Sequence, residues 1–549
     1  RPIYEACLAV DASSADALTQ RELEHTLRDY RRSGVNQPEE IRERIKKLND
    51  ELTALDQEFS LNVRADVRSI KLDSASELAG LPEDYIADHP PGDDGKITIT
   101  TDYPDYVPFS QFAHNDARRF ELYCAFKNRG YPKNETILKE ILTKRHELAN
   151  LLGYKNYADY VTETKMVKTP QTVRTFIDEV SRIAKPRAQR EYNMLLNRLK
   201  QIDPAAEKVG DWQKSYLEEL IRQEQFQVDA KEIRTYFQFG HVRDGILKLT
   251  GELFGVHYRP WDTPVWAPNV TAYEMLDGDT VIGRFYLDLH PRENKYKHAA
   301  HFGLQCGVKG RQLPTAALIC NFPGKDDETE LMNHSDVETF LHEFGHLLHT
   351  LFSGNHEWSR FSGIATELDF VEAPSQMLEE WVWNMQSLSY LALSKDGQPI
   401  PADLVKKMVA AKEFGTGLFA THQMFYAATS INFYDCDPAT LDLSKTMDQM
   451  QLNYSMFEPV ADTHMYANFG HLIGYSAMYV TYMWSLVISQ DLFSQFEQAG
   501  LFDPATAQKY RKIFLAQGGA KDAADLVQDF LGRPYSIEPF AQWLNDDAQ

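Results

Sequence analysis

The sequence predicts a mainly α-helical protein with a small β-sheet, and three observations support this fold class. Apolar residues recur at three- and four-residue steps over most of the chain, which is the period of helices packed on a core. Alternating, strand-like stretches are few. The 549 residues are 43% apolar, 12% aromatic and 25% charged, a composition typical of a folded protein with room for two or more lobes. Intrinsic disorder is therefore excluded as the main state.

The predicted elements follow from these periods. A helix is expected to begin near Pro38, which suits a first turn, and its apolar stripe runs to Phe59. Further helices are expected at residues 137–152, 171–200, 212–228, 402–427, 474–494 and 504–516. Strands are expected at residues 96–101, 281–289 and 315–322. Composition marks no boundary between domains.

The charge balance limits the partners. Lys and Arg number 57 against 80 Asp and Glu, which gives a net charge of −23. This acidity argues against nucleic acid and anionic membranes as partners and favours neutral or basic ligands. No uninterrupted apolar run approaches the length of a membrane-spanning helix. The five cysteines form no C-x-x-C pair, so neither a disulfide framework nor a cysteine zinc site is expected.

One predicted helix carries a metal-binding motif. Ser335 followed by Glu338 indicates a capping box and a helix start at Ser335. The H-E-x-x-H sequence follows, with His342, Glu343 and His346. Residues four apart share one face of a helix, so the two imidazoles can bind a single zinc ion while the Glu between them faces the same cleft as a base.

The third ligand is not fixed by spacing. Catalytic zinc usually has three protein ligands and one open position. A second apolar segment follows the motif, and Pro374 indicates a helix entry or a kink within it. Spacing alone does not choose among four of its acidic residues: Glu367, Asp369, Glu372 and Glu379.

Together the two segments resemble the thimet oligopeptidase and neurolysin family of zinc metallopeptidases. The resemblance rests on HEFGHLLH at residues 342–349 and DFVEAPSQMLEEWVW at residues 369–383, and it extends over nearly the whole chain. It implies that Glu372 is the third ligand of one zinc ion per chain. It also implies two largely helical lobes around a deep substrate channel, with the small sheet beside the zinc-binding helix. Residues 1–215 would then form a mostly helical section of the non-catalytic lobe and channel wall, and residues 216–549 the catalytic section, with lobes that are expected to be discontinuous in sequence.

The start of the chain bears on location. The sequence begins at Arg1 without a Met or a signal-like segment, and Arg1 corresponds to an interior point of the family. We therefore expect the family's N-terminal helical section to be missing. A cytoplasmic monomer is expected, and a periplasmic or secreted location stays open because the natural N-terminus is expected to be absent.

Amide hydrolysis needs a base and donors for the developing oxyanion. Glu343 is the expected base, and it would pass its proton to the leaving amine. Tyr475, Tyr479 and Tyr482 recur at four- and three-residue steps and are expected on one helix face. The resemblance implies that Tyr479 donates to the oxyanion with Tyr482 beside it. Tyr475 and His471 would contact the substrate, and His471 is also counted among the expected catalytic residues. Three residues separate His471 from Tyr475, where the family has four with paired glycines.

Supporting roles are expected for four further residues. Glu338 lies one turn before the first zinc histidine and would either orient that imidazole or serve only in the cap. Asp369 would hold His346. Residues 315–322 resemble a family strand beside the zinc cleft, and its backbone, with Ala317 and Asn321, would bind an extended peptide as an added strand.

The leading functional prediction is a zinc-dependent endopeptidase that hydrolyses internal bonds of short peptides. A dipeptidyl carboxypeptidase of the same family is the first alternative, although carboxydipeptidases tend to have F-V-E-F-P where residues 370–374 read F-V-E-A-P. Leu368 stands where familiar oligopeptidases carry an Arg, which leaves the cleavage-site preference open. A catalytically silent peptide-binding protein is the second alternative.

Overall fold

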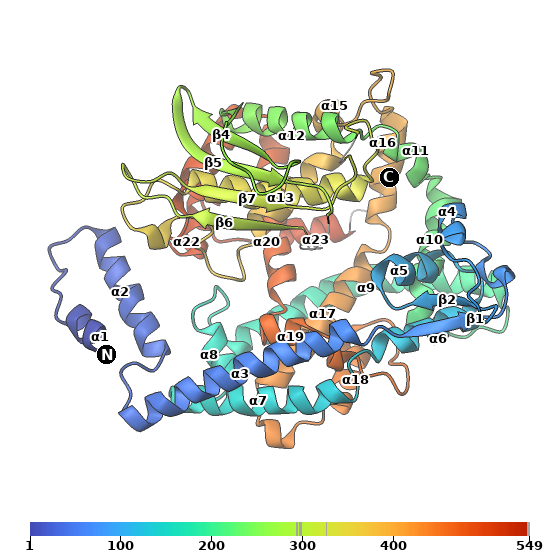
Figure 1. The fold of residues 1–549 in the computed structure, drawn as a ribbon, viewed down its shortest axis with the longest axis horizontal. Coiled ribbons are helices and arrows are strands. Elements are labelled where there is room, and N and C mark those ends of the chain that lie inside the picture. Colours follow the sequence, from blue (N-terminus) through green and yellow to red (C-terminus); the bar gives the residue numbers. More distant parts are fainter. Residues whose placement is uncertain (293–294, 296–298, 325–326, 546–549) are drawn as a thin grey trace. The chain divides into compact units, whose positions relative to one another are not determined.

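The computed structural model describes residues 1–292, 295, 299–324 and 327–545, and it confirms a mainly helical protein with a small sheet (Figure 1). The chain forms two compact units. Unit 1 comprises Asp29–Gln227 and Lys412–Val480 together with Arg1, and unit 2 comprises Pro2–Arg28, Val228–Ala411 and Thr481–Gln549. Each unit is assembled from separate stretches of chain.

Unit 1 is built from paired long helices. Helix α3 (Glu39–Ala65) packs along α7 (Lys133–Leu151), and α9 (Pro170–Ile202) packs along α17 (Thr416–Tyr434). The stripe predicted after Pro38 is buried, with Ile45, Leu48, Leu52 and Phe59 inside. The other helices of this unit are α4 (Glu83–Asp88), α5 (Tyr103–Phe112), α6 (Asp116–Lys127), α8 (Tyr157–Thr162), α10 (Lys214–Ile221), α18 (Leu443–Tyr454) and α19 (His471–Gly474).

The helix predicted at residues 402–427 is two helices. Helix α16 (Ala402–Glu413) ends before Gly415, and α17 begins at Thr416. Gly415 has a φ of 92°, a left-handed conformation that glycine adopts without steric cost and that a continuous right-handed helix does not contain. The glycine therefore marks a break that the apolar period alone does not reveal.

Unit 2 contains a five-stranded sheet. Its strand order is β3 (His257–Pro260), β4 (Thr271–Asp277), β5 (Thr280–Asp288), β7 (Thr315–Ile319) and β6 (Ala300–Gln305), with β5 and β7 parallel and the other pairs antiparallel. Helix α13 (His334–Phe352) packs against β5, β6 and β7 (Figure 1). The strands predicted at 281–289 and 315–322 are confirmed as β5 and β7. Strands β3, β4 and β6 were not predicted, because buried and exposed side chains do not alternate cleanly along them.

Unit 2 also contains further helices. Among them, α14 (Ala373–Glu379) packs against both α13 and α20 (Thr481–Ala499). The others are α1 (Pro2–Leu8), most of α2 (Ala17–Arg32), α11 (Ala230–Arg234), α12 (Phe239–Phe254), α15 (Met385–Leu391), most of α16, α21 (Pro504–Lys509), α22 (Ala523–Leu531) and α23 (Glu538–Asn545). No helix within the described ranges is long and apolar enough to cross a membrane.

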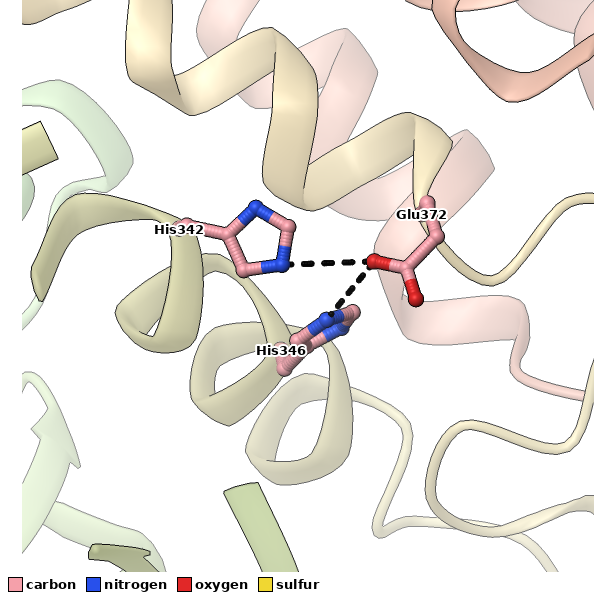
Figure 2. A group of neighbouring side chains, drawn as sticks. All are labelled: His342, His346 and Glu372. Atoms are coloured by element: carbon pink, nitrogen blue, oxygen red, sulfur yellow. Dashed lines mark ion pairs between the residues drawn. The ribbon is translucent and has the colours of Figure 1, made fainter. Parts of the chain in front are cut away.

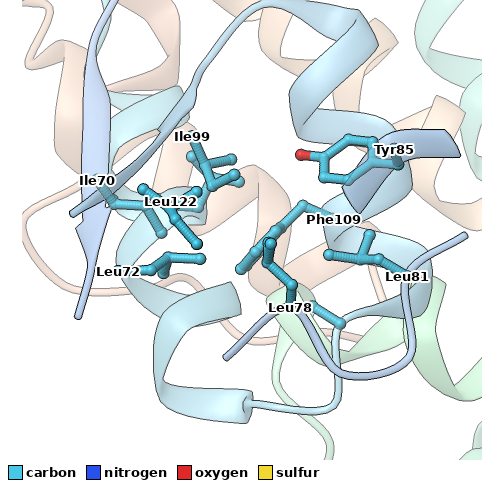
Figure 3. Packing of buried hydrophobic residues seen from close by; sticks show 10 residues of the cluster. Ile70, Leu72, Leu78, Leu81, Tyr85, Ile99, Phe109 and Leu122 are labelled. Atoms are coloured by element: carbon cyan, nitrogen blue, oxygen red, sulfur yellow. The ribbon is translucent and has the colours of Figure 1, made fainter. Parts of the chain in front are cut away.

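A small separate core lies in unit 1, at the strand predicted at residues 96–101. Strands β1 (Ser69–Leu72) and β2 (Ile97–Thr100) pair antiparallel and turn Ile70, Leu72, Ile97 and Ile99 inward. Figure 3 shows Ile70, Leu72 and Ile99 in one cluster with Phe109 of α5, which is fully buried. The cluster fixes the two-stranded sheet to the helices that follow it.

Phe109→Ala should loosen this cluster. Truncating a buried Phe typically costs about 3 to 5 kcal/mol through lost burial and the cavity left behind. We expect hydrogen exchange of the β1 and β2 amides to accelerate accordingly, measured by mass spectrometry. Val107→Ala on the same helix is the control, because Val107 is 38% exposed. Unchanged protection of β1 and β2 in the Phe109 variant would contradict this account of the core.

Candidate metal centre

Helix α13 positions the first two candidate ligands. It begins at His334 with Asn333 as its N-cap, and the Asn333 N–H donates to Asp336 Oδ2 at 2.8 Å. The capping box predicted at Ser335 and Glu338 is therefore wrong by two residues, because Asn333 and Asp336 satisfy the same three-residue spacing one half-turn earlier. The helix continues to Phe352 and carries the whole H-E-x-x-H motif.

The three predicted ligands meet in one group. Glu372 Oε2 lies 3.3 Å from His342 Nε2 and 3.2 Å from His346 Nε2. Figure 2 shows the carboxylate facing both imidazoles. Among the described residues, these three form a group whose ligand atoms all lie within 4.8 Å of one another. Glu372 directly precedes α14, so its carboxylate comes from the end of that helix.

The donor set fits a divalent metal. Zinc binds imidazole nitrogens and carboxylate oxygens at about 2.0–2.2 Å, and ligands at such distances around a tetrahedral centre lie about 3.3 to 3.4 Å apart. The separations of 3.3 and 3.2 Å match this spacing. Two nitrogens and one oxygen leave a fourth position open, as in catalytic rather than structural zinc sites.

The same contacts set the charge states of the group. Burial alone would lower the pKa of His342, but hydrogen bonds to Glu372 and Glu379 raise it to about 10. Against the effect of burial, the two histidines hold the pKa of the Glu372 carboxyl well below its usual range. An imidazolium therefore pairs with carboxylates at neutral pH, and a metal must displace its proton.

Glu379 is a supporting residue that the predictions missed. His342 Nδ1 lies 2.6 Å from Glu379 Oε1. Glu372 and Glu379 are seven residues apart, two turns of helix, so both carboxylates face α13 and contact opposite nitrogens of one imidazole. Such a contact fixes the ring orientation of a metal-binding histidine. The seven-residue spacing was the available sequence signal.

Two predicted supporting roles are corrected. Glu338 accepts a hydrogen bond from Trp383 Nε1 at 3.0 Å, while the Nδ1 of His342 contacts Glu379 instead. The buried Nδ1 of His346 has no hydrogen-bond partner in the part of the chain that the structure describes, so Asp369 does not hold it. The positions of the two acidic residues explain this difference. Asp369 lies in the turn before Glu372, whereas Glu379 lies on α14, the helix that packs against α13.

Glu343 lies between the sheet and the ligand group. It is 7% exposed, and burial raises the pKa of its carboxyl, although the charges of His342 and His346 oppose this shift. The backbone N–H of His301, on β6, donates to this carboxylate. The candidate base thus contacts the last strand of the sheet.

The predicted substrate strand is not at the sheet edge. Strand β7 pairs with β5 on one side and β6 on the other, and Ala317 is 1% exposed. The β7 backbone is therefore already hydrogen-bonded, and Ala317 cannot receive an added strand. Asn321 follows β7 in the stretch that continues the pairing with β5 through Cys320 and Phe322. The edge strand next to β7 is β6, where Phe302 and Leu304 are 43% and 52% exposed.

The three tyrosines do not share one helix. Helix α19 ends at Gly474, residues 475–480 form turns with Ser476 in a left-handed conformation (φ 53°), and α20 begins at Thr481. The helix predicted at 474–494 is thus wrong in its first two turns. Tyr482 opens α20 in the unit that holds the ligand group, and its carbonyl accepts from Gln376 Nε2 of α14 at 3.4 Å.

Tyr479, Tyr475 and His471 belong to unit 1. Tyr479 is 8% exposed, donates its hydroxyl proton to Gln423 Oε1 at 3.0 Å, and has a pKa raised by burial. The His471 ring lies 5.1 Å from the Tyr479 ring and 5.5 Å from that of Tyr475, and burial lowers the pKa of His471. Their meeting with the ligand group of unit 2 stays a prediction.

Glu379→Gln tests the orienting contact on His342. The amide keeps the shape of the side chain but removes its charge, so we expect metal affinity to fall about 10- to 100-fold. Competition with a chromogenic chelator measures the affinity. Glu380→Gln is the matched control, since Glu380 accepts from Gln490 and follows Glu379 in the chain. Equal affinity in both variants would show that the 2.6 Å contact does not orient the ligand.

Comparisons with known proteins show the family of the chain. Residues 111–546 match the family described as "Peptidase family M3". The chain is 30% identical to "Oligopeptidase A" of Escherichia coli (strain K12) over 94% of this chain and 80% of the relative, and 31% identical to "Saccharolysin" of Saccharomyces cerevisiae over 97% and 79%. The solved structure "PZ PEPTIDASE A with inhibitor 2" shares the fold, with a TM-score of 0.60 at 14% identity over 100% of this chain and 84% of that one. The chain therefore belongs to peptidase family M3 and is a metallopeptidase.

Proposed function

We propose that the protein is a zinc-dependent endopeptidase that hydrolyses internal bonds of short peptides. The observation that carries this proposal is the group of His342, His346 and Glu372 with Glu343 next to it in the motif. Two imidazoles and one carboxylate with an open fourth position are typical of catalytic zinc. A bound zinc ion would lower the pKa of a water molecule and polarise the scissile carbonyl.

Glu343 is proposed as the general base and then the general acid. A raised pKa brings a carboxyl nearer to neutral pH, where it can accept a proton and return it to the leaving amine. Its burial limits competing hydrogen bonds from bulk water. Tyr479 is proposed as an oxyanion donor on the basis of the family resemblance, and its hydroxyl has a proton to donate because burial raises its pKa further above neutral pH. Tyr482, Tyr475 and His471 are proposed as neighbouring substrate contacts.

Strand β6 is proposed to receive the peptide. Its outer edge pairs with no other strand among the described residues, so it can pair with an extended chain through backbone hydrogen bonds, which discriminate little between side chains. The His301 N–H that reaches Glu343 belongs to this strand, so a peptide paired there would run close to the base. The exposed Phe302 and Leu304 would provide apolar contacts for the substrate.

A short quenched peptide with an amidated C-terminus separates the candidate activities. Mass spectrometry of the products should show internal cleavage that a chelator abolishes and added zinc restores. Cleavage of only the free-acid form, with loss of C-terminal dipeptides, would favour the carboxydipeptidase. Binding of the peptide without cleavage by the zinc-loaded protein would favour the silent binding protein. A monomeric state and a cytoplasmic location stay predictions.

Glu343→Gln should abolish most of this activity. Removing a general base typically costs about 10² to 10⁴ in kcat. Zinc content, measured by mass spectrometry of the metal, should stay at the level of the unaltered protein because Glu343 is not among the three grouped ligands. Glu338→Gln on the same helix serves as the control and should retain activity. A Glu343 variant that retains zinc and full kcat would refute the proposed base.

Metal binding should tighten as pH rises. The pKa of His342 is raised to about 10, so below that pH its imidazole holds a proton that the metal must displace. Releasing one proton increases affinity about tenfold per pH unit between pH 6 and 8. Calorimetric titrations in buffers of different ionisation enthalpy would count the released protons. An affinity that does not change over this range would contradict the assigned charge state.

A further inference from the structure

We propose that Arg145 is a positioning residue for the segment from Gly470 to Val480, here called the tyrosine loop. It holds this loop in the conformation that catalysis requires. The inference rests on the proposed function, because the loop carries Tyr475 and Tyr479. All of the contacts that support it lie within unit 1.

Arg145 reaches the loop from α7. Its Nη2 donates to the Ile473 carbonyl at 2.8 Å, and its Nη1 donates to the Leu472 carbonyl at 3.2 Å. Nη1 also donates to the Tyr434 hydroxyl at 2.8 Å, and that hydroxyl in turn donates to the Leu472 carbonyl at 2.5 Å. Asp56 Oδ2 accepts from Nη2 at 3.2 Å and supplies the counter-charge. Arg145 is 6% exposed, so these bonds form away from bulk water.

The two carbonyls need such a partner. They belong to α19, a single turn of helix from His471 to Gly474, and the last carbonyls of a helix have no donor within it. The residues that follow form turns, so no ladder of helix or strand bonds fixes them. The planar guanidinium presents several donors in one fork, which lets a single side chain bind both carbonyls.

A second anchor holds the far half of the loop. Ser430 Oγ donates to the Ser476 carbonyl at 2.6 Å and accepts from the Tyr479 N–H at 3.3 Å. Ser476 has a φ of 53°, a conformation that is uncommon outside glycine and asparagine. The contact therefore maintains a strained turn that sets the direction of Tyr479.

One face of α17 supplies most of these anchors. Gln423, Ser430 and Tyr434 follow one another at seven and four residues, so they lie on the same side of the helix. They bind the Tyr479 hydroxyl, the Ser476 turn and the α19 carbonyl in that order. Arg145 adds a cationic group to these contacts, and it links α7 to the same surface.

Arg145→Met tests the inference with two readouts. We expect kcat/KM for the quenched peptide to fall about 10- to 100-fold, mainly through kcat, because small displacements of catalytic groups cost about this much. Zinc content should not change. Hydrogen exchange of amides in the tyrosine loop should accelerate about tenfold or more, since its anchoring bonds are lost. Arg145→Lys should recover part of both losses, because one ammonium keeps the charge but not the fork.

Arg174→Met is the matched control. Arg174, on α9, also contacts the C-terminal end of α17: it binds Asp435 Oδ2 at 2.9 Å and Asn432 Oδ1 at 3.0 Å. We expect the Arg174 variant to change neither kcat/KM nor the exchange of the tyrosine loop. If Arg145→Met does not fold, Tyr434→Phe removes only the hydroxyl and should show smaller changes in the same directions.

The outcomes separate this inference from the proposed function. Unchanged exchange in the tyrosine loop would overturn the positioning role, whether or not the protein cleaves peptides. Faster exchange with unchanged kcat would also overturn it, because the loop would then not need its shape for catalysis. Faster exchange in a protein whose unaltered form cleaves no peptide would refute the proposed peptidase function while retaining the structural anchor.

Discussion

The candidate metal centre depends on one close contact between two helix backbones. A Cβ atom added to Gly345 would lie 2.8 Å from the Ser375 Cα, closer than carbon atoms approach without a shift of the backbone. Glycine at this position therefore allows α13 and α14 to touch. Because Gly345 lies within the H-E-x-x-H motif and Ser375 lies three residues after Glu372, the contact brings the third ligand to the two histidines. The sheet behind α13 and helix α20 behind α14 hold the pair together.

This arrangement places charge in a poorly hydrated region. An imidazolium and two carboxylates are brought together largely out of water, and such pairs add little net stability because desolvation offsets their attraction. Stability must come from elsewhere, for example from Phe340, Phe344 and Leu347 on the apolar side of α13. This desolvation cost is consistent with a group of residues whose role is catalysis rather than stability. A divalent cation would replace the proton and neutralise the carboxylates more completely.

The sequence was informative where chemistry and periodicity coincide. The H-E-x-x-H spacing predicted both the helix and the two histidines of the group, and the family resemblance predicted Glu372, which spacing alone left open. Three features were missed for physical reasons. The capping pair Asn333 and Asp336 has the same spacing as the pair at Ser335, so spacing could not distinguish them. The interior position of β7 depends on pairing with β6, in whose sequence apolar and polar residues do not alternate. The turn at Ser476 requires a left-handed serine, which side-chain periodicity cannot indicate.

The two halves of the proposed site are positioned by different kinds of contact. Gly345 sets Glu372 by direct backbone packing, which has no adjustable group, so a bulkier residue there would displace a whole helix. Arg145, Ser430 and Tyr434 set the tyrosine loop by side-chain hydrogen bonds, each of which can be lost singly. A metal ligand tolerates little displacement, because affinity depends on the distances among three atoms at once. A hydrogen-bond donor on a turn tolerates more, since its bond strength changes gradually with distance and angle. Backbone packing therefore suits the metal ligands, whose distances must be held closely. Side-chain hydrogen bonds suit the tyrosine loop, whose donors can move slightly and still bind the oxyanion.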